Sequence, residues 1–248
     1  MTPVREDGRL GSAEAHPASA DPVYVRRRDA IVASAAGHQV GAPSPIVEYT
    51  AAEHGVWRRV HAALAGAREG RVCRVVEAAC RQAPIPSDRV PQHAEVGDRL
   101  RELSGFTCTL AGGIVPNKRF LGAMADRYFH AAVQAAPGCA PVRLDSDDAL
   151  DLISRVYWYR LGYGTARENG TVKAYGAALL SSYRELHRFH RARIRRWNIL
   201  DLVRQPYQVT GYQPLLFAVD CLDHLAEELH AFSTTSTKPP ANDTAFHP

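Results

Sequence analysis

The sequence predicts a mainly α-helical fold with a small amount of β-sheet. Apolar residues recur at helical spacing over most of residues 21–232, capping signals mark several helix starts, and one short segment carries a hairpin signal. The chain of 248 residues is long enough to bury one large core, and its 46% hydrophobic and 23% charged residues are typical of a globular protein. We therefore expect a single domain over residues 21–232.

Two capping signals define the first helices. Asp21 followed by Pro22 provides a capping side chain and a proline at the first helical position, and predicts a helix to about His38. Thr50 and Glu53 form a capping box, which predicts the start of a second helix.

The middle of the chain predicts further helices and one short strand. Helices are expected over about residues 71–81 and 95–103. Weak alternation of apolar and polar residues over 107–115 favours a strand, and a helix that starts near Asn117 should extend to Tyr128.

The last third of the chain begins with an aromatic run, residues 157–159, on another predicted helix. Gly162 follows in the same stretch, and a glycine inside a helix costs about 1 kcal/mol relative to alanine, so the helix should fray or end there. The pair at 169–170, Asn-Gly, predicts the turn of a hairpin. Apolar residues over 222–232 predict a final helix.

Both ends of the chain have the composition of disordered tails. Residues 1–20 are rich in Ala, Gly, Ser, Pro and charge, and residues 233–248 are rich in Ser, Thr and Pro. The start of the chain is too polar for a signal peptide, and the five cysteines include no Cys-x-x-Cys pair. These features predict a cytoplasmic protein with reduced thiols, and the lack of a long apolar stretch predicts no membrane partner.

The net charge of +4 is small for a chain of this length. Basic residues cluster at 26–28 and along 184–196, which could suggest a nucleic-acid partner. The alternative is a solvated helix face, and we favour it because a phosphate-binding surface usually has more excess charge and exposed aromatic residues. No nucleic-acid partner is expected.

An ordered set of short segments resembles the catalytic domain of the pterin-dependent aromatic amino acid hydroxylases, the family of phenylalanine, tyrosine and tryptophan hydroxylase. No single segment is specific for this family, but the order of the segments over most of the chain is specific for it. The resemblance implies a shortened version of that catalytic-domain fold. The segments are Asp21–Tyr24, Val47–Thr50, Ile85–Pro86, Val90–Gln92, Thr107–Phe120, Tyr157–Tyr159, Asn169–Tyr183 and Tyr212–Leu215.

The resemblance implies an iron site, but its ligands are missing from the matching positions. In the family, iron is bound by two histidines of a His-Glu-x-x-Gly-His run and by a glutamate after the Tyr-Trp-aromatic run, a ligand set that leaves positions open for oxygen. The segment between Phe129 and Asp145 is far shorter here and has no such histidine pair, and Gly162 stands at the glutamate position. The family pterin site is matched by Gly113 and Phe120. The two serines of that site are replaced here by Pro116 and Asn117, and its glutamate contact is missing. We therefore predict no metal ligands and expect neither iron nor tetrahydropterin as a cofactor.

The resemblance also implies residues of the amino acid site. Trp158 matches a wall of that site and Ser181 a serine near the bound amino acid, although core packing and a helix cap would explain the two residues equally well. Arg143 or Arg160 could hold the substrate carboxylate, because only arginine offers a planar fork of donors. The missing side chain of Gly162 could admit a ligand, although close packing is the favoured explanation.

Three functions remain open. The first is a metal-free enzyme that performs acid and base chemistry on an aromatic or cyclic substrate, which could serve a specialised biosynthesis. The second is a pterin-dependent monooxygenase with relocated iron ligands, and the third is a non-catalytic binding or partner subunit. A monomer or dimer is expected in each case. The candidate proton carriers for the first are Tyr157, Tyr159, Glu185 and His130.

Overall fold

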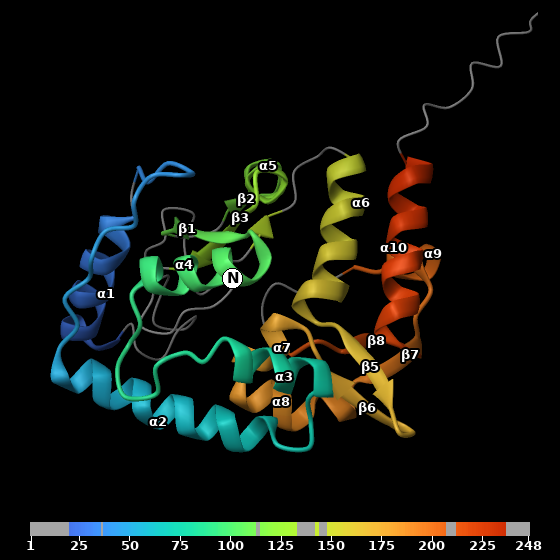
Figure 1. Ribbon diagram of the computed structural model, residues 1–248, viewed down its shortest axis with the longest axis horizontal. Coiled ribbons are helices and arrows are strands. Elements are labelled where there is room, and N and C mark those ends of the chain that lie inside the picture. Colours follow the sequence, from blue (N-terminus) through green and yellow to red (C-terminus); the bar gives the residue numbers. More distant parts are fainter. Residues whose placement is uncertain are drawn as a thin grey trace, which may run out of the picture.

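The structure is a computed structural model and describes residues 20–35, 37–112, 115–132, 142–143, 148–206 and 212–236. Helices account for most of these residues and the strands are short (Figure 1). The predicted mainly α fold with a small amount of sheet is confirmed.

Helices α1 (Pro22–Ser34) and α2 (Ala51–Arg68) begin at the predicted caps. The Asp21 carboxylate accepts hydrogen bonds from two backbone N–H groups of the first turn of α1. Thr50 and Glu53 form the complete capping box of α2, the long helix along the lower edge of Figure 1. Helix α1 ends at Ser34, earlier than the predicted end near His38.

Helices α3 (Arg74–Gln82) and α4 (His93–Ser104) lie within a few residues of the predicted ranges. Gly105 follows α4 with φ of 74°, a left-handed conformation that glycine adopts without steric cost. The indole Nε1 of Trp57 donates a hydrogen bond of 2.7 Å to the carbonyl of Pro86, which ties α2 to the segment between α3 and α4.

The predicted strand is β1 (Thr107–Ala111), which pairs in parallel with β3 (Tyr128–Ala132). The prediction that the helix from Asn117 extends to Tyr128 is wrong. Helix α5 (Asn117–Ala125) ends earlier because Arg127 adopts φ of 63°, which is incompatible with a right-handed helix, and Tyr128 then opens β3. A shorter parallel pair joins β2 (Val115–Pro116) to β4 (Val142–Arg143).

Helix α6 (Asp148–Tyr157) does not fray as the chain approaches Gly162. It continues as a π-helical turn, Trp158–Gly162, closed by a 2.8 Å hydrogen bond from the amide of Tyr163 to the carbonyl of Trp158. Turns of this kind insert a residue into a helix and occur often at functional sites.

The predicted hairpin is confirmed as β5 (Thr165–Glu168) and β6 (Thr171–Ala174). Asn169 and Gly170 have φ of 50° and 76°, as a two-residue hairpin turn of this hand requires. The hairpin is part of a sheet with strand order β6-β5-β8-β7. The remaining elements are α7 (Ala177–Ser181), α8 (Tyr183–Arg188), a 3-10 turn (Phe189–Arg191), β7 (Arg193–Arg196), α9 (Ile199–Leu202), β8 (Leu215–Val219) and α10 (Leu222–Ser236), which extends past the predicted boundary at residue 232.

The largest hydrophobic cluster joins this sheet to the π-helical turn and to α7, α8 and α10. A smaller cluster of Ala111, Val115, Phe120 and Tyr157 joins β1, α5 and the end of α6. Of the predicted site residues, Trp158 and Tyr159 belong to the larger cluster, and Phe120 and Tyr157 belong to the smaller one.

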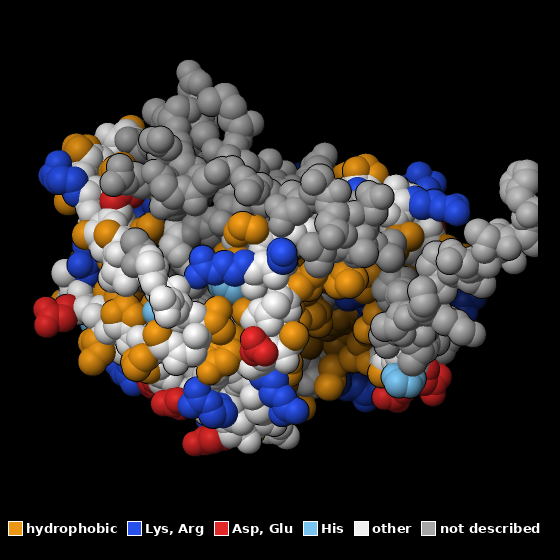
Figure 2. Space-filling view, turned by 90° about the horizontal axis from the view of Figure 1, so that it is seen from above, with side chains coloured by type: hydrophobic (Ala, Val, Ile, Leu, Met, Phe, Trp, Pro, Cys, Tyr) orange, Lys and Arg blue, Asp and Glu red, His pale blue; other side chains and the backbone are white. Residues whose placement is uncertain are grey.

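Charged side chains of both signs alternate along the lower edge of the face in Figure 2, and hydrophobic side chains line a hollow on the same face. None of the helices within the described ranges is long and apolar enough to cross a membrane. Free thiols are found at Cys73, Cys80, Cys108 and Cys221.

Candidate functional site

One group of predicted site residues meets beside the smaller cluster. The ring of Phe120 on α5 lies 4.8 Å from that of Tyr157 in an edge-to-face arrangement and 5.6 Å from that of His130 in a stacked one. His130 is fully buried on β3. The predicted cofactor residue Phe120 therefore contacts two of the predicted proton carriers.

Buried polar side chains of this region include three that have no hydrogen-bond partner among the residues that the structure describes. Thr109 and His130 occupy paired positions of β1 and β3, and Asn117 is the first residue of α5. The Thr109 hydroxyl, both ring nitrogens of His130 and both amide atoms of Asn117 lack a partner. Buried polar groups are nearly always paired in native proteins, so this group indicates a site that a ligand or water completes.

His130 is neutral at physiological pH. Burial, with smaller contributions from the positive charges of Arg119 and His38, lowers the pKa of its ring to about 4. A neutral imidazole offers one donor and one acceptor. His130 can therefore bind a neutral heterocycle or accept a proton.

The buried neutral histidine predicts a pH-dependent stability. The unfolded chain should protonate His130 near pH 6.5 and the folded protein only near pH 4, so the free energy of unfolding should fall as the pH falls through this window. Urea unfolding at several pH values measures this slope. In a His130→Gln variant the free energy of unfolding should depend less steeply on pH. An unchanged slope would contradict the assignment of His130 as a buried, neutral histidine.

The second group surrounds the π-helical turn. The indole of Trp158 packs 5.1 Å from the ring of Tyr163, and its Nε1 donates to Oε1 of Gln213 at 3.4 Å. The backbone N–H of Gln213 donates to Oε1 of Glu185 at 2.9 Å. Glu185 is buried, and burial raises the pKa of its carboxyl. This chain of contacts holds the indole that the sequence predicts as a wall of the amino acid site.

Tyr159 makes contacts of a structural kind. Its hydroxyl donates a 2.7 Å hydrogen bond to the carbonyl of Pro206, and its ring packs edge-to-face on Phe217 at 5.3 Å. Tyr159 belongs to the larger cluster, and Glu185 accepts a hydrogen bond from Gln213. Tyr157 belongs to the smaller cluster, and His130 stacks on Phe120 of that cluster. The four predicted proton carriers are therefore not gathered at one point, and their catalytic role stays a prediction.

Arg160 is the most unusual residue of the π-helical turn. Only 1% of it is exposed, and its guanidinium lies 4.1 Å from the ring of Trp197 and 5.2 Å from that of Tyr175. Within the described part of the chain, none of its three side-chain nitrogens has a hydrogen-bond partner. Burial lowers its pKa to about 10, so the group keeps its charge at neutral pH. Arg160 is a cation without a hydrogen-bonded anion.

Gly162 is buried, yet a Cβ built on it would meet no atom within 4 Å. The sequence favoured close packing as the reason for this glycine, and the open space argues against that explanation. Close packing occurs instead at Gly164 and Gly176, where a Cβ would lie 2.2 Å from the Arg160 carbonyl oxygen and 2.3 Å from the Gly164 amide nitrogen, respectively.

The other predicted substrate and cofactor residues lie apart from this region or cannot be placed. Ser181 is exposed, donates to the carbonyl of Ala178 at 3.2 Å, and lines a groove of about 720 Å³ between α2 and α3. Arg143 is in β4, but its side chain lies outside the described part of the structure, as does the whole of Gly113.

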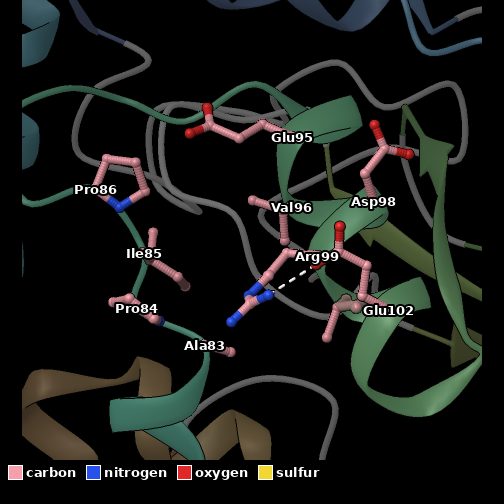
Figure 3. Close-up of a pocket in the computed structure, with 10 residues that line it drawn as sticks. Ala83, Pro84, Ile85, Pro86, Glu95, Val96, Asp98, Arg99 and Glu102 are labelled. Carbon is pink, nitrogen blue, oxygen red and sulfur yellow. Dashed lines mark hydrogen bonds and ion pairs between the residues drawn. The ribbon is translucent and has the colours of Figure 1, made fainter.

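A further groove of about 620 Å³ lies between residues 83–86 and α4 (Figure 3). Arg99 extends across it and donates to Glu102 at 2.7 Å and to the carbonyl of Gln82 at 2.8 Å. No predicted site residue lines this groove, so we do not assign the amino acid site to it.

Sequence reasoning missed several residues that the structure brings to the site. Thr109, Tyr175, Trp197 and Gln213 were not singled out, and Asn117 was noted only as a replaced serine. A polar residue inside an apolar strand was an available signal for Thr109. The contacts of the others are long-range, so no local pattern could have identified them.

Comparisons with known proteins point to one family. Residues 8–144 and 140–243 match the family described as biopterin-dependent aromatic amino acid hydroxylase. The chain is 34% identical to phenylalanine 3-hydroxylase of Streptomyces coeruleorubidus, over 89% of this chain and 91% of that protein. It is 31% identical to tyrosine 3-monooxygenase of Bos taurus, over 90% of this chain and 54% of that protein, so it spans about half of the animal enzyme.

Solved structures show the same fold. Phenylalanine hydroxylase of Chromobacterium violaceum, with bound iron(III) and 7,8-dihydrobiopterin, aligns with a TM-score of 0.69 at 18% identity, over 84% of this chain and 93% of that one. The same enzyme with bound iron and phenylalanine gives a TM-score of 0.68 at 18% identity. The fold and site thus define a protein of the aromatic amino acid hydroxylase class. The chain belongs to the biopterin-dependent aromatic amino acid hydroxylase family.

The comparisons correct the expectation that no cofactor is used. The matching family is described as biopterin-dependent, and the matching crystal structures contain iron and dihydrobiopterin, so iron and a pterin are the cofactors to expect. Among the described residues, the buried polar atoms of Asn117 and His130 have no hydrogen-bond partner, and hydrogen-bonding atoms of a ligand would satisfy them.

The described residues do not fit an iron site of the family type. Among them, no three His, Cys, Asp or Glu side chains are close enough together to hold a metal ion. Gly162 offers no donor atom at the position where the resemblance places a glutamate ligand. The segment in which the resemblance places the histidine ligands lies largely outside the described residues.

Proposed function

We propose that this protein binds an aromatic amino acid together with a pterin and acts as an aromatic amino acid monooxygenase. The observation that carries the proposal is the similarity to phenylalanine 3-hydroxylase over nearly the full length of both chains. A phenylalanine-like substrate is therefore the first to test. A monomer or dimer without nucleic-acid or membrane partners is part of the proposal.

The residues around the π-helical turn support an amino acid site. The rings of Trp158 and Tyr163, which are tilted against each other, offer an aromatic wall, and Gln213 and Glu185 fix the indole through consecutive hydrogen bonds. Arg160 would bind the substrate carboxylate, because its buried guanidinium has no hydrogen-bond partner. Open space beside Gly162 leaves room for a ligand atom.

The residues of the smaller cluster support pterin binding. Asn117 and His130 would hold the ring edge, and Phe120 would cover a face of the site. A bound reduced pterin supplies the reducing equivalents for this class of oxygen chemistry. His130, neutral at pH 7, can accept a proton within the site.

A second candidate function is aromatic amino acid binding with non-oxidative acid and base chemistry or none. The absence of a side chain at Gly162 and of a three-ligand group among the described residues favours this candidate. It shares the amino acid site with the first proposal and differs in the reaction.

One experiment separates these candidates. The purified protein, reconstituted with ferrous iron, is assayed for phenylalanine binding by calorimetry, then for oxygen consumption and hydroxylated products with a reduced pterin. Product formed in step with oxygen consumption supports the monooxygenase. Binding without product supports the second candidate, and no binding of any aromatic amino acid would exclude both.

The role of Arg160 is tested separately. Arg160→Met keeps an unbranched apolar stem over Trp197 but removes the charge. We expect phenylalanine affinity to fall at least tenfold, whereas the thermal midpoint should hold or rise because an unpaired buried charge is lost. Phenethylamine, which lacks the carboxylate, should bind both proteins alike. Equal loss for both ligands would indicate a structural role only.

A further inference from the structure

A cluster of basic and aromatic side chains lines a shallow depression beside α8. The lining residues are Tyr183, Arg184, His187, Arg188 and Tyr212, and the depression has a volume of about 360 Å³. Four of these residues come from α8, and the fifth lies just before β8. None of the five belongs to the proposed amino acid or pterin site.

The two arginines of the depression lack an acidic partner. Arg184 and Arg188 are exposed and stand at i and i+4, so their positive charges lie on one face of α8 and repel each other. Neither guanidinium makes an ion pair with another described residue, whereas Arg195 and Arg196 of the same basic run each pair with an aspartate. The acidic residue of α8, Glu185, is buried. A bound anion would offset the repulsion between the two exposed charges.

Aromatic rings hold part of this cluster in place. The guanidinium of Arg188 lies 4.5 Å from the centroid of the Tyr212 ring, and the rings of Tyr183 and His187 meet edge-to-face at 4.7 Å. A guanidinium stacked on a ring still presents its N–H edge to an anion, and it loses less conformational freedom on binding. Tyr183 is 50% exposed and Tyr212 is 41% exposed, so ring surface is available to a ligand as well.

These features match a phosphate monoester joined to a flat ring. Arginine binds phosphate oxygens through paired N–H donors, and two arginines suit the nearly double negative charge of a phosphate monoester. Exposed aromatic side chains stack on the bases of nucleotides. The depression is at the small end of the range for ligand sites, and a nucleic-acid strand needs a groove that follows several nucleotides. A mononucleotide is therefore favoured over a strand.

We infer that this depression binds a nucleoside 5′-phosphate, with Arg184 and Arg188 on the phosphate and the ring of Tyr183 on the base. The inference is independent of the proposed monooxygenase activity, because it uses no residue of the amino acid or pterin site. It gives the exposed tyrosines beside the basic run at 184–196 a role that a solvated helix face does not require.

The test uses calorimetry on the full chain. Three ligands are compared: adenosine 5′-monophosphate, adenosine, which lacks the phosphate, and ribose 5-phosphate, which lacks the base. Arg184→Gln/Arg188→Gln removes both charges of the depression. The matched control is Arg191→Gln/Arg193→Gln, which removes two exposed arginines of the same basic run that do not line the depression. Thermal unfolding shows whether each variant is folded.

Adenosine 5′-monophosphate should bind the wild type more tightly than either fragment does. Its affinity should fall roughly tenfold or more in Arg184→Gln/Arg188→Gln, because charge-assisted hydrogen bonds to the phosphate are lost. The control variant should keep the wild-type affinity. In Tyr183→Ser the affinity for the nucleotide should fall, while that for ribose 5-phosphate should stay the same.

Three results would overturn the inference and leave the proposed function standing. They are a wild-type protein that does not bind the nucleotide, an equal loss of affinity in both double variants, and tighter binding of a single-stranded oligonucleotide than of the mononucleotide. If Arg184→Gln/Arg188→Gln does not fold, the single variants Arg184→Gln and Arg188→Gln take its place, and each must weaken nucleotide binding.

Discussion

Gly176→Ala is expected to destabilise the protein by about 3 kcal/mol, the upper end of the usual cost of overpacking. A Cβ at this position would lie 2.3 Å from the amide nitrogen of Gly164 and 2.4 Å from the carbonyl oxygen of Gly162. Both are backbone atoms, so no side-chain rotation can relieve the clash. The Gly176 amide also donates a 2.9 Å hydrogen bond to the Gly164 carbonyl, which a shift would break. Urea unfolding of variant and wild type measures the difference.

Gly162→Ala is the matched control. It places the same methyl group in the same region, but the built Cβ meets nothing within 4 Å. Its stability should be unchanged or up to about 1 kcal/mol higher, because alanine is the better helix residue. A similar loss in both variants would show that the region is sensitive to any substitution and that backbone contact at Gly176 is not the cause.

Phe120→Ala should lower the free energy of unfolding by about 3–5 kcal/mol, the usual cost of removing a buried phenylalanine. The ring is 0% exposed and contacts the rings of Phe129, His130 and Tyr157 at 5.9, 5.6 and 4.8 Å. A cavity would therefore open at the centre of the smaller cluster. Chemical denaturation followed by tyrosine and tryptophan fluorescence measures the loss.

Phe120→Leu separates packing from aromatic contact. Leucine fills part of the volume, so the loss should be clearly smaller than for alanine. Dihydrobiopterin binding should nevertheless weaken in both variants if the ring forms part of the pterin site. Equal destabilisation by leucine and alanine would mean that ring stacking, and not the filled volume, stabilises the cluster.

Local signals predicted much of the fold. The caps at Asp21 and Thr50 and the Asn-Gly turn at 169–170 act through hydrogen bonds and dihedral preferences within a few residues, so the sequence reveals them directly. The end of α5 was missed because Arg127 has a positive φ, a conformation that is uncommon for a residue other than glycine and that no local pattern indicated.

The candidate site was predictable only in part. Family resemblance identified Trp158, Phe120 and the glycine at 162, and the structure places each beside a buried cluster or an open space. The partners of Arg160, two aromatic rings distant in sequence, come from tertiary packing. The expectation of no cofactor was wrong. It relied on the missing ligand residues and gave less weight to the overall relationship to cofactor-binding proteins.

The open volume beside Gly162 has a consequence for how this chain can change. A methyl group could occupy that position without displacing a neighbouring element, because a Cβ built there meets open space. Position 162 is therefore one at which the scaffold itself does not demand a glycine, and the first carbon of a new side chain can be added there.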